Sequence, residues 1–130
     1  MTLAPSLDDL AVLAEGAWAR LPAAFREAAG PVVIRVQDFA EDDLLADLGL
    51  EDPFELTGLY HGVDLTQATF SDPNPRPAEV FLYRRPILDE WVERGDLPLA
   101  ELVEHVLIHE IGHHFGLSDD DIDAIEDGRR

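Results

Sequence analysis

The sequence contains no cysteine and no lysine, and its only methionine is Met1. Without cysteine there are no disulfide bonds and no thiolate metal ligands, so any metal must be bound by histidine, aspartate or glutamate. Nine basic residues, all arginine, stand against 28 acidic residues, and the formal net charge is −19. This charge argues against nucleic acid and anionic membranes as partners, because both require a basic surface. It leaves a solvated acidic surface or a basic partner.

Long hydrophobic runs are also missing. No apolar stretch approaches the roughly 18 residues that a membrane-spanning helix requires. The N-terminal stretch lacks the basic start and apolar centre of a signal peptide, because Asp8, Asp9 and Glu15 interrupt it. We therefore expect a single cytoplasmic domain comprising all 130 residues.

Hydrophobic spacing, together with glycine and proline breakers, predicts short strands between helices. Ser6 and Asp9 have the spacing of a capping box at the start of the first helix. Three strands flanked by helices indicate an α+β domain with a small, mostly antiparallel sheet of three or four strands. The predicted helices are 6–21, 22–29, 41–50, 86–95, 97–116 and 118–128, the predicted strands are 31–37, 55–62 and 78–84, and 71–77 is a loop.

The stretch HEIGHHFGLSD at 109–119 contains three of the five histidines. His109 and His113 are four residues apart, so on a helix they lie on the same face. Two imidazoles placed in this way can bind one zinc ion at about 2.0–2.1 Å. Glu110 is rotated by roughly 100° from His109, so it can flank the metal and act as a general base on a water molecule.

A third ligand must come from outside this helical row, because a catalytic zinc takes three protein ligands. Gly116 permits the chain to turn, and Asp119 follows three residues later. The full spacing is H-E-x-x-H-x-x-G-x-x-D. Two alternatives remain: Asp119 only stabilises the start of the next helix, or Glu126 is the third ligand.

Other polar residues are candidates for stabilising an oxyanion or lining a pocket. Tyr60, His61 and Tyr83 come from predicted strands. His105 lies one turn before His109 on the same row, where a half-buried structural histidine is the simpler interpretation. His114 points away from that row and is expected to be structural.

Most of the chain after residue 20 resembles the small bacterial zincin-like metallopeptidases. The resemblance implies a minimal zincin fold in which His109, His113 and Asp119 bind zinc and Glu110 is the base. The extended motif is also similar to that of metzincins, with Asp119 in place of their usual third histidine. Met1 cannot supply the metzincin methionine turn, so a reduced zincin core is implied. The segments that resemble the family are 32–39, 56–62, 80–87 and, most specifically, 105–119.

These observations predict a zinc-dependent peptidase that hydrolyses peptides or proteins, with a preference for basic ones. A substrate strand is expected to add to a sheet edge, for which GLYHG at 58–62 is the candidate. Two alternatives use the same residues: a metal-binding interaction module without hydrolysis, and a zinc hydrolase that acts on a small amide.

Overall fold

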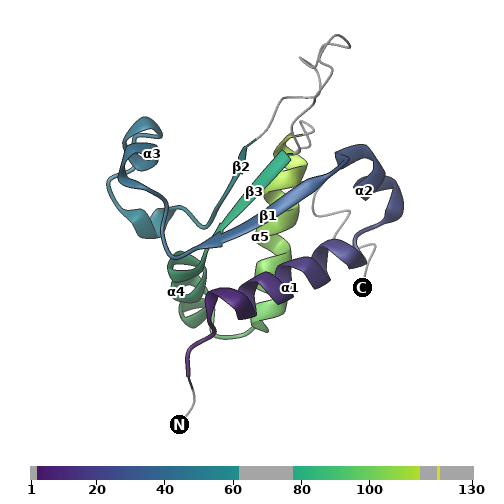
Figure 1. The fold of residues 1–130 in the computed structure, drawn as a ribbon. Helices are drawn as coiled ribbons and strands as arrows, with labels where there is room; N and C mark the ends of the chain where they lie inside the picture. The colour runs from purple at the N-terminus through teal and green to yellow at the C-terminus, as the bar shows by residue number, and fades with distance from the viewer. Residues whose placement is uncertain (1–2, 62–77, 115–119, 121–130) are drawn as a thin grey trace.

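The computed structural model describes residues 3–61, 78–114 and 120. Within them the chain is α+β, as the sequence predicts (Figure 1). The predicted loop at 71–77 and, apart from Asp120, the predicted helix at 118–128 lie outside the described residues. The elements in chain order are α1 (Leu7–Arg20), α2 (Ala23–Ala29), β1 (Val32–Gln37), α3 (Asp42–Asp47), the 3₁₀ turn η1 (Pro53–Glu55), β2 (Gly58–His61), β3 (Ala78–Tyr83), α4 (Arg84–Arg94) and α5 (Leu99–His114).

The sheet has β3 at its centre, in the order β1-β3-β2. β2 pairs with β3 in the antiparallel direction, but β1 pairs with β3 in the parallel direction. The prediction of a mostly antiparallel sheet is therefore corrected to a mixed sheet over the described residues. A parallel pair needs a long crossover connection. The chain between β1 and β3, which includes α3, η1 and β2, is long enough to supply one.

Helix α1 begins as its sequence predicts. The Ser6 hydroxyl accepts a hydrogen bond from the Asp9 backbone N–H, and the Asp9 carboxylate accepts one from the Ser6 N–H. This reciprocal pair satisfies two backbone donors that a helix start leaves open. Leu10, Ala14 and Ala17 then form a fully buried stripe. Small residues in the stripe let α1 pack closely against α5 and β1.

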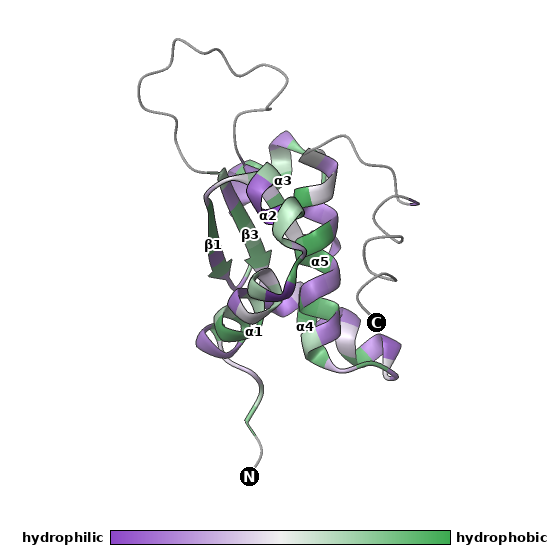
Figure 2. Cartoon of the chain, turned by 90° about the vertical axis from the view of Figure 1, so that its right-hand side faces the viewer, coloured by the Kyte–Doolittle hydropathy of each residue, from purple (hydrophilic) through white to green (hydrophobic). Residues whose placement is uncertain are grey.

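Helix α5 carries the main core. The predicted apolar face is confirmed, because all six of its residues belong to one buried cluster with Val80 and Leu82 of β3. Full burial of each such side chain contributes about 1.5–3 kcal/mol. The hydropathy colouring in Figure 2 shows α5 striped in hydrophobic and hydrophilic residues beside the hydrophobic strands. The six residues are Leu99, Leu102, Val103, Val106, Leu107 and Ile111.

The other face of the sheet has its own smaller core. Successive residues of a strand point to opposite faces. Val80 and Leu82 therefore face α5, whereas Phe81 and Tyr83 face the opposite side of the sheet. Tyr83 packs with residues of and around α3, including Leu45, and is only 1% exposed. Residues of α3 thus pack at the face of the sheet opposite α5.

Several boundaries differ from the predicted ones, and two of them have local reasons. Helix α4 begins at Arg84, where the guanidinium binds the Asp38 carboxylate at 2.9 Å, and the Arg85 N–H donates to the Asp38 carbonyl. Strand β2 begins only at Gly58, because the Asp52 carboxylate caps the turn η1 by accepting from the Phe54 N–H. No helix in the described part of the chain is both long and apolar enough to cross a bilayer.

The contact between β2 and α5 predicts the outcome of one substitution. A Cβ atom at Gly58 would lie 2.8 Å from Val106 Cγ1 and 3.2 Å from both Glu110 Cγ and the Phe81 carbonyl oxygen. Gly58→Ala should therefore lower the free energy of unfolding by about 1–3 kcal/mol, the usual effect of overpacking. Urea denaturation measures this directly.

Gly16→Ala is the matched control. Its Cβ would meet only the flexible end of Arg20, at 3.2 Å, within helix α1. Alanine in a helix interior stabilises it by about 0.5–1 kcal/mol relative to glycine. A Gly58→Ala variant as stable as the wild type would contradict the close approach of β2 to α5.

Candidate metal centre

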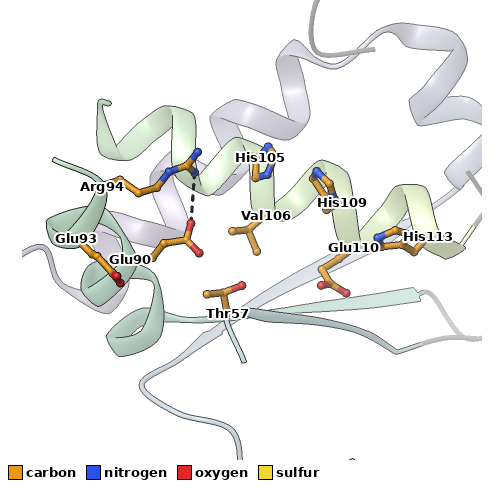
Figure 3. Close-up of a pocket in the computed structure, with 9 residues that line it drawn as sticks. All are labelled: Thr57, Glu90, Glu93, Arg94, His105, Val106, His109, Glu110 and His113. Atoms are coloured by element: carbon orange, nitrogen blue, oxygen red, sulfur yellow. Dashed lines mark ion pairs between the residues drawn. The ribbon is translucent and has the colours of Figure 1, made fainter. Parts of the chain in front are cut away.

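A cavity of about 580 Å³ lies along α5 and contains most of the predicted motif. His105, His109 and His113 form one row along the helix, and Glu110 reaches from the same helix toward the sheet (Figure 3). The structure therefore brings four predicted site residues into one cavity wall: His105, His109, Glu110 and His113. The rest of the lining is Thr57, Val106 and, from α4, Glu90, Glu93 and Arg94.

The spacing of the imidazole rings distinguishes two pairs in the row. The ring centroids of His109 and His113 are 5.7 Å apart with an interplanar angle of 61°, whereas those of His105 and His109 are 4.1 Å apart with an angle of 53°. Two imidazoles on one tetrahedral zinc at 2.0–2.1 Å have centroids about 5 Å apart. His109 and His113 need only a small closing movement to share a metal. The His105 and His109 ring centroids are closer than about 5 Å, so these two rings are too close together to share one tetrahedral zinc.

Glu110 lies where α5 meets β2. The backbone N–H of Tyr60 donates a hydrogen bond to its carboxylate. Burial raises the pKa of the Glu110 carboxyl above its usual range, while the Tyr60 N–H and the charge of His113 act in the opposite direction. The carboxylate is thus held between a backbone donor on the strand and the histidine row on its own helix.

The pairing of β2 places this donor on the outer edge of the sheet. The Tyr83 N–H donates to the Thr57 carbonyl, so these residues form a hydrogen-bonded pair. Such pairs alternate along an antiparallel ladder. Gly58 and Tyr60 are therefore in non-bonded pairs with β3, and their N–H and C=O groups point away from it. Within the described residues, β2 is the edge strand that the GLYHG segment was expected to form, and Glu110 lies against that edge.

The other candidates divide between the two faces of the sheet. Tyr60 packs against the core on the α5 side, and His105 lines the cavity. His61 is exposed, and it lines a second cavity on the opposite face together with Tyr83. The pKa of Tyr83 is raised by burial and further by the negative charges of Glu110 and Glu41. The structure does not bring His61 or Tyr83 into the cavity along α5, and the side chain of His114 is outside the description.

Both candidates for the third ligand, Asp119 and Glu126, lie outside the described residues, as does Gly116. No group of three or more histidine, aspartate or glutamate side chains gathers to hold a metal in the part of the chain that the structure describes. His109 and His113 nevertheless fit zinc, because neutral imidazoles four apart on one helix are a donor pair that zinc prefers. They are therefore candidates for two of the three protein ligands of a zinc ion.

Sequence reasoning missed the wall that α4 contributes. Glu90 and Arg94 form an ion pair at 3.5 Å across one helical turn, and Glu93 lines the same wall (Figure 3). These residues belong to no recognisable motif. Their only sequence signal is an amphipathic helix with charges at i and i+4, which is typical of any exposed helix. Their place at the cavity follows from the packing of α4 against α5.

Comparison with known proteins agrees with this geometry. The family model described as Zincin-like metallopeptidase matches residues 29–129, which include all three strands and α5. No curated protein matches the chain. The match covers most of the 130 residues and contains both zinc-binding candidates, the candidate base and the edge strand. The chain therefore belongs to the zincin-like metallopeptidase family.

Proposed function

We propose that this protein is a zinc-dependent peptidase in which His109 and His113 bind zinc and Glu110 is the general base. The observation that carries the proposal is the arrangement of these residues along one wall of a single cavity, with Glu110 at the outer edge of β2. Membership of the zincin-like metallopeptidase family supports the same reaction class.

Zinc bound here would supply Lewis-acid chemistry, which activates a water molecule at neutral pH and polarises the scissile carbonyl. The Glu110 carboxylate accepts the proton of the attacking water and returns it to the leaving amine nitrogen. The Tyr60 N–H orients the carboxylate between β2 and α5. Glu110 is therefore a base held in place by the strand beside which the substrate lies.

A peptide substrate would extend the sheet at the outer edge of β2. The N–H and C=O groups of Gly58 and the C=O group of Tyr60 point outward there and can pair with an extended backbone, whereas the Tyr60 N–H already donates to Glu110. Tyr60 and His105 remain candidates for stabilising the oxyanion, because they lie on the α5 side of the sheet. The net charge of −19 favours substrates with lysine or arginine.

The metal assignment predicts the zinc content of three proteins. Wild-type protein purified without chelator should contain about one zinc per chain. The double variant His109→Ala/His113→Ala should contain almost none, because it lacks both helical donors. His105→Ala is the control from the same row and should keep its zinc. The His105 ring lies against His109, with centroids 4.1 Å apart, and is not proposed to bind the metal. Elemental analysis measures all three, and equal zinc in the wild type and the double variant would rule out this site.

The role of Glu110 predicts a different combination of effects. Glu110→Gln should keep its zinc and lose about 10²–10⁴-fold in kcat, because the amide cannot accept the proton. Glu101→Gln removes the same charge from an exposed position of α5 and should be as active as the wild type. Cleavage of a broad peptide library by zinc-loaded protein gives both rates.

The same assay separates the alternatives. Loss of zinc in Glu110→Gln would reassign Glu110 to the metal ligands. A zinc-loaded wild type that cleaves no peptide would support a metal-binding module. Hydrolysis of small amides alone would support the small-amide hydrolase.

The third ligand is proposed to be Asp119, and neighbouring acids test it. Asp119→Ala should weaken zinc binding by more than about tenfold, since even residues that only support a ligand typically contribute 10–100-fold. Asp120→Ala removes an exposed charge next to it and should have little effect. Glu126→Ala should also leave affinity nearly unchanged. Titration against a competing chelator gives the three affinities, and loss of zinc only in Glu126→Ala would replace Asp119 by Glu126.

A further inference from the structure

A second cavity, of about 300 Å³, lies on the face of the sheet opposite α5. Its volume is at the lower end of the roughly 300–1,000 Å³ range of ligand pockets, so it suits one long side chain better than a larger ligand. Its floor comes from all three strands, and Glu41 and Leu44 close it from the start of α3. Nothing in the proposed reaction uses this cavity.

The lining combines apolar walls with carboxylates. Leu44, Leu59 and Phe81 provide hydrophobic surface, and the Phe81 and Tyr83 rings are nearly parallel, with centroids 6.5 Å apart. Methylene chains of lysine and arginine pack on such surfaces, and their charged ends are attracted to ring faces. The cavity can therefore accommodate the stem of a long basic side chain.

The carboxylates at the cavity favour a positive charge at the end of such a side chain. Glu41 and Glu79 line the cavity, and none of the arginines in the described part of the chain does. Arg35, which is about half exposed, lies outside the lining and binds Oε2 of Glu79 from there. A positive group in the cavity would have Glu41 and Glu79 as carboxylate partners, in competition with Arg35 for the latter.

Strand β2 links this cavity to the zincin site. Gly58 and Tyr60 face α5, whereas Leu59 and His61 face the second cavity, because side chains alternate along a strand. A peptide paired with the outer edge of β2 would likewise direct every second side chain to the opposite face. Neighbouring strands are about 4.7–4.9 Å apart. A lysine or arginine on the added strand can therefore extend over His61 toward Glu79, which is directly opposite His61 on β3.

We propose that this far-face cavity is a specificity subsite for a lysine or arginine side chain of the peptide that lies along β2. The proposal rests on the proposed function for its substrate strand, but the recognition of a cationic side chain does not depend on hydrolysis. In this proposal, the acidic protein selects a basic substrate at one defined place, through the carboxylates of this cavity.

The test uses two small probes with the full chain. Nα-acetyl-arginine methylamide carries the cation, and the citrulline analogue has nearly the same shape without the charge. The arginine probe should shift the backbone amide resonances of Leu59 and Phe81, and the citrulline probe should bind several times more weakly. Glu41→Gln/Glu79→Gln should weaken the arginine probe by about threefold to tenfold, as expected for two partly exposed ion pairs. Glu101→Gln, at an exposed position that lines neither cavity, should leave binding unchanged.

Arg35→Gln should change the affinity for the arginine probe in the opposite direction. Removing this competing guanidinium leaves Glu79 for the probe, so affinity should rise by about twofold to fivefold. A general loss of structure would weaken binding in every variant. Equal binding of both probes, or weaker binding in Arg35→Gln, would overturn the subsite. Probe binding that persists in a protein unable to cleave any peptide would overturn the proposed function alone.

Discussion

The close contact between Gly58 of β2 and the side chains of Val106 and Glu110 on α5 is the constraint on which the site depends. A helix with histidines four apart can bind a metal wherever it is placed. The catalytic proposal also requires Glu110 to be held beside the position of a substrate. Glycine at 58 lets the strand approach closely enough for the Tyr60 N–H to reach the Glu110 carboxylate. The same contact fixes the helix, the Glu110 carboxylate and the edge of the sheet relative to one another.

Strand β2 consequently contributes residues to both faces of the sheet. On the α5 side, Gly58 and Tyr60 contact or face the helix that carries the motif, and on the other side Leu59 and His61 line a smaller acidic cavity. The alternation of side chains along a strand makes this possible without additional domains. A small domain can thus combine a reaction site with selection for charge, even though it cannot build a deep pocket.

The sequence predicts those parts of the fold that depend on local chemistry. The capping box at Ser6 and the apolar stripe of α5 were predictable because each depends on residues only a few positions apart in the sequence. The His109 and His113 row followed from helical spacing alone. The prediction of a mostly antiparallel sheet missed the parallel pairing of β1 with β3, since strand direction depends on a crossover that no short pattern encodes. Glu90 and Glu93 at the cavity, and the separation of Tyr83 from it, depend on how α4 and α3 pack, which spacing along the chain does not specify.

X-ray absorption spectroscopy at the zinc edge tests the central claim most directly, because it counts the imidazoles around the metal and measures their distances. The account predicts two imidazole nitrogens at about 2.0–2.1 Å, with oxygen ligands completing the shell. His105→Ala should leave the spectrum unchanged, since the ring contact of 4.1 Å places His105 against His109 and not on the metal. A spectrum with three imidazoles, or one that keeps both imidazoles after replacement of His113, would contradict the account.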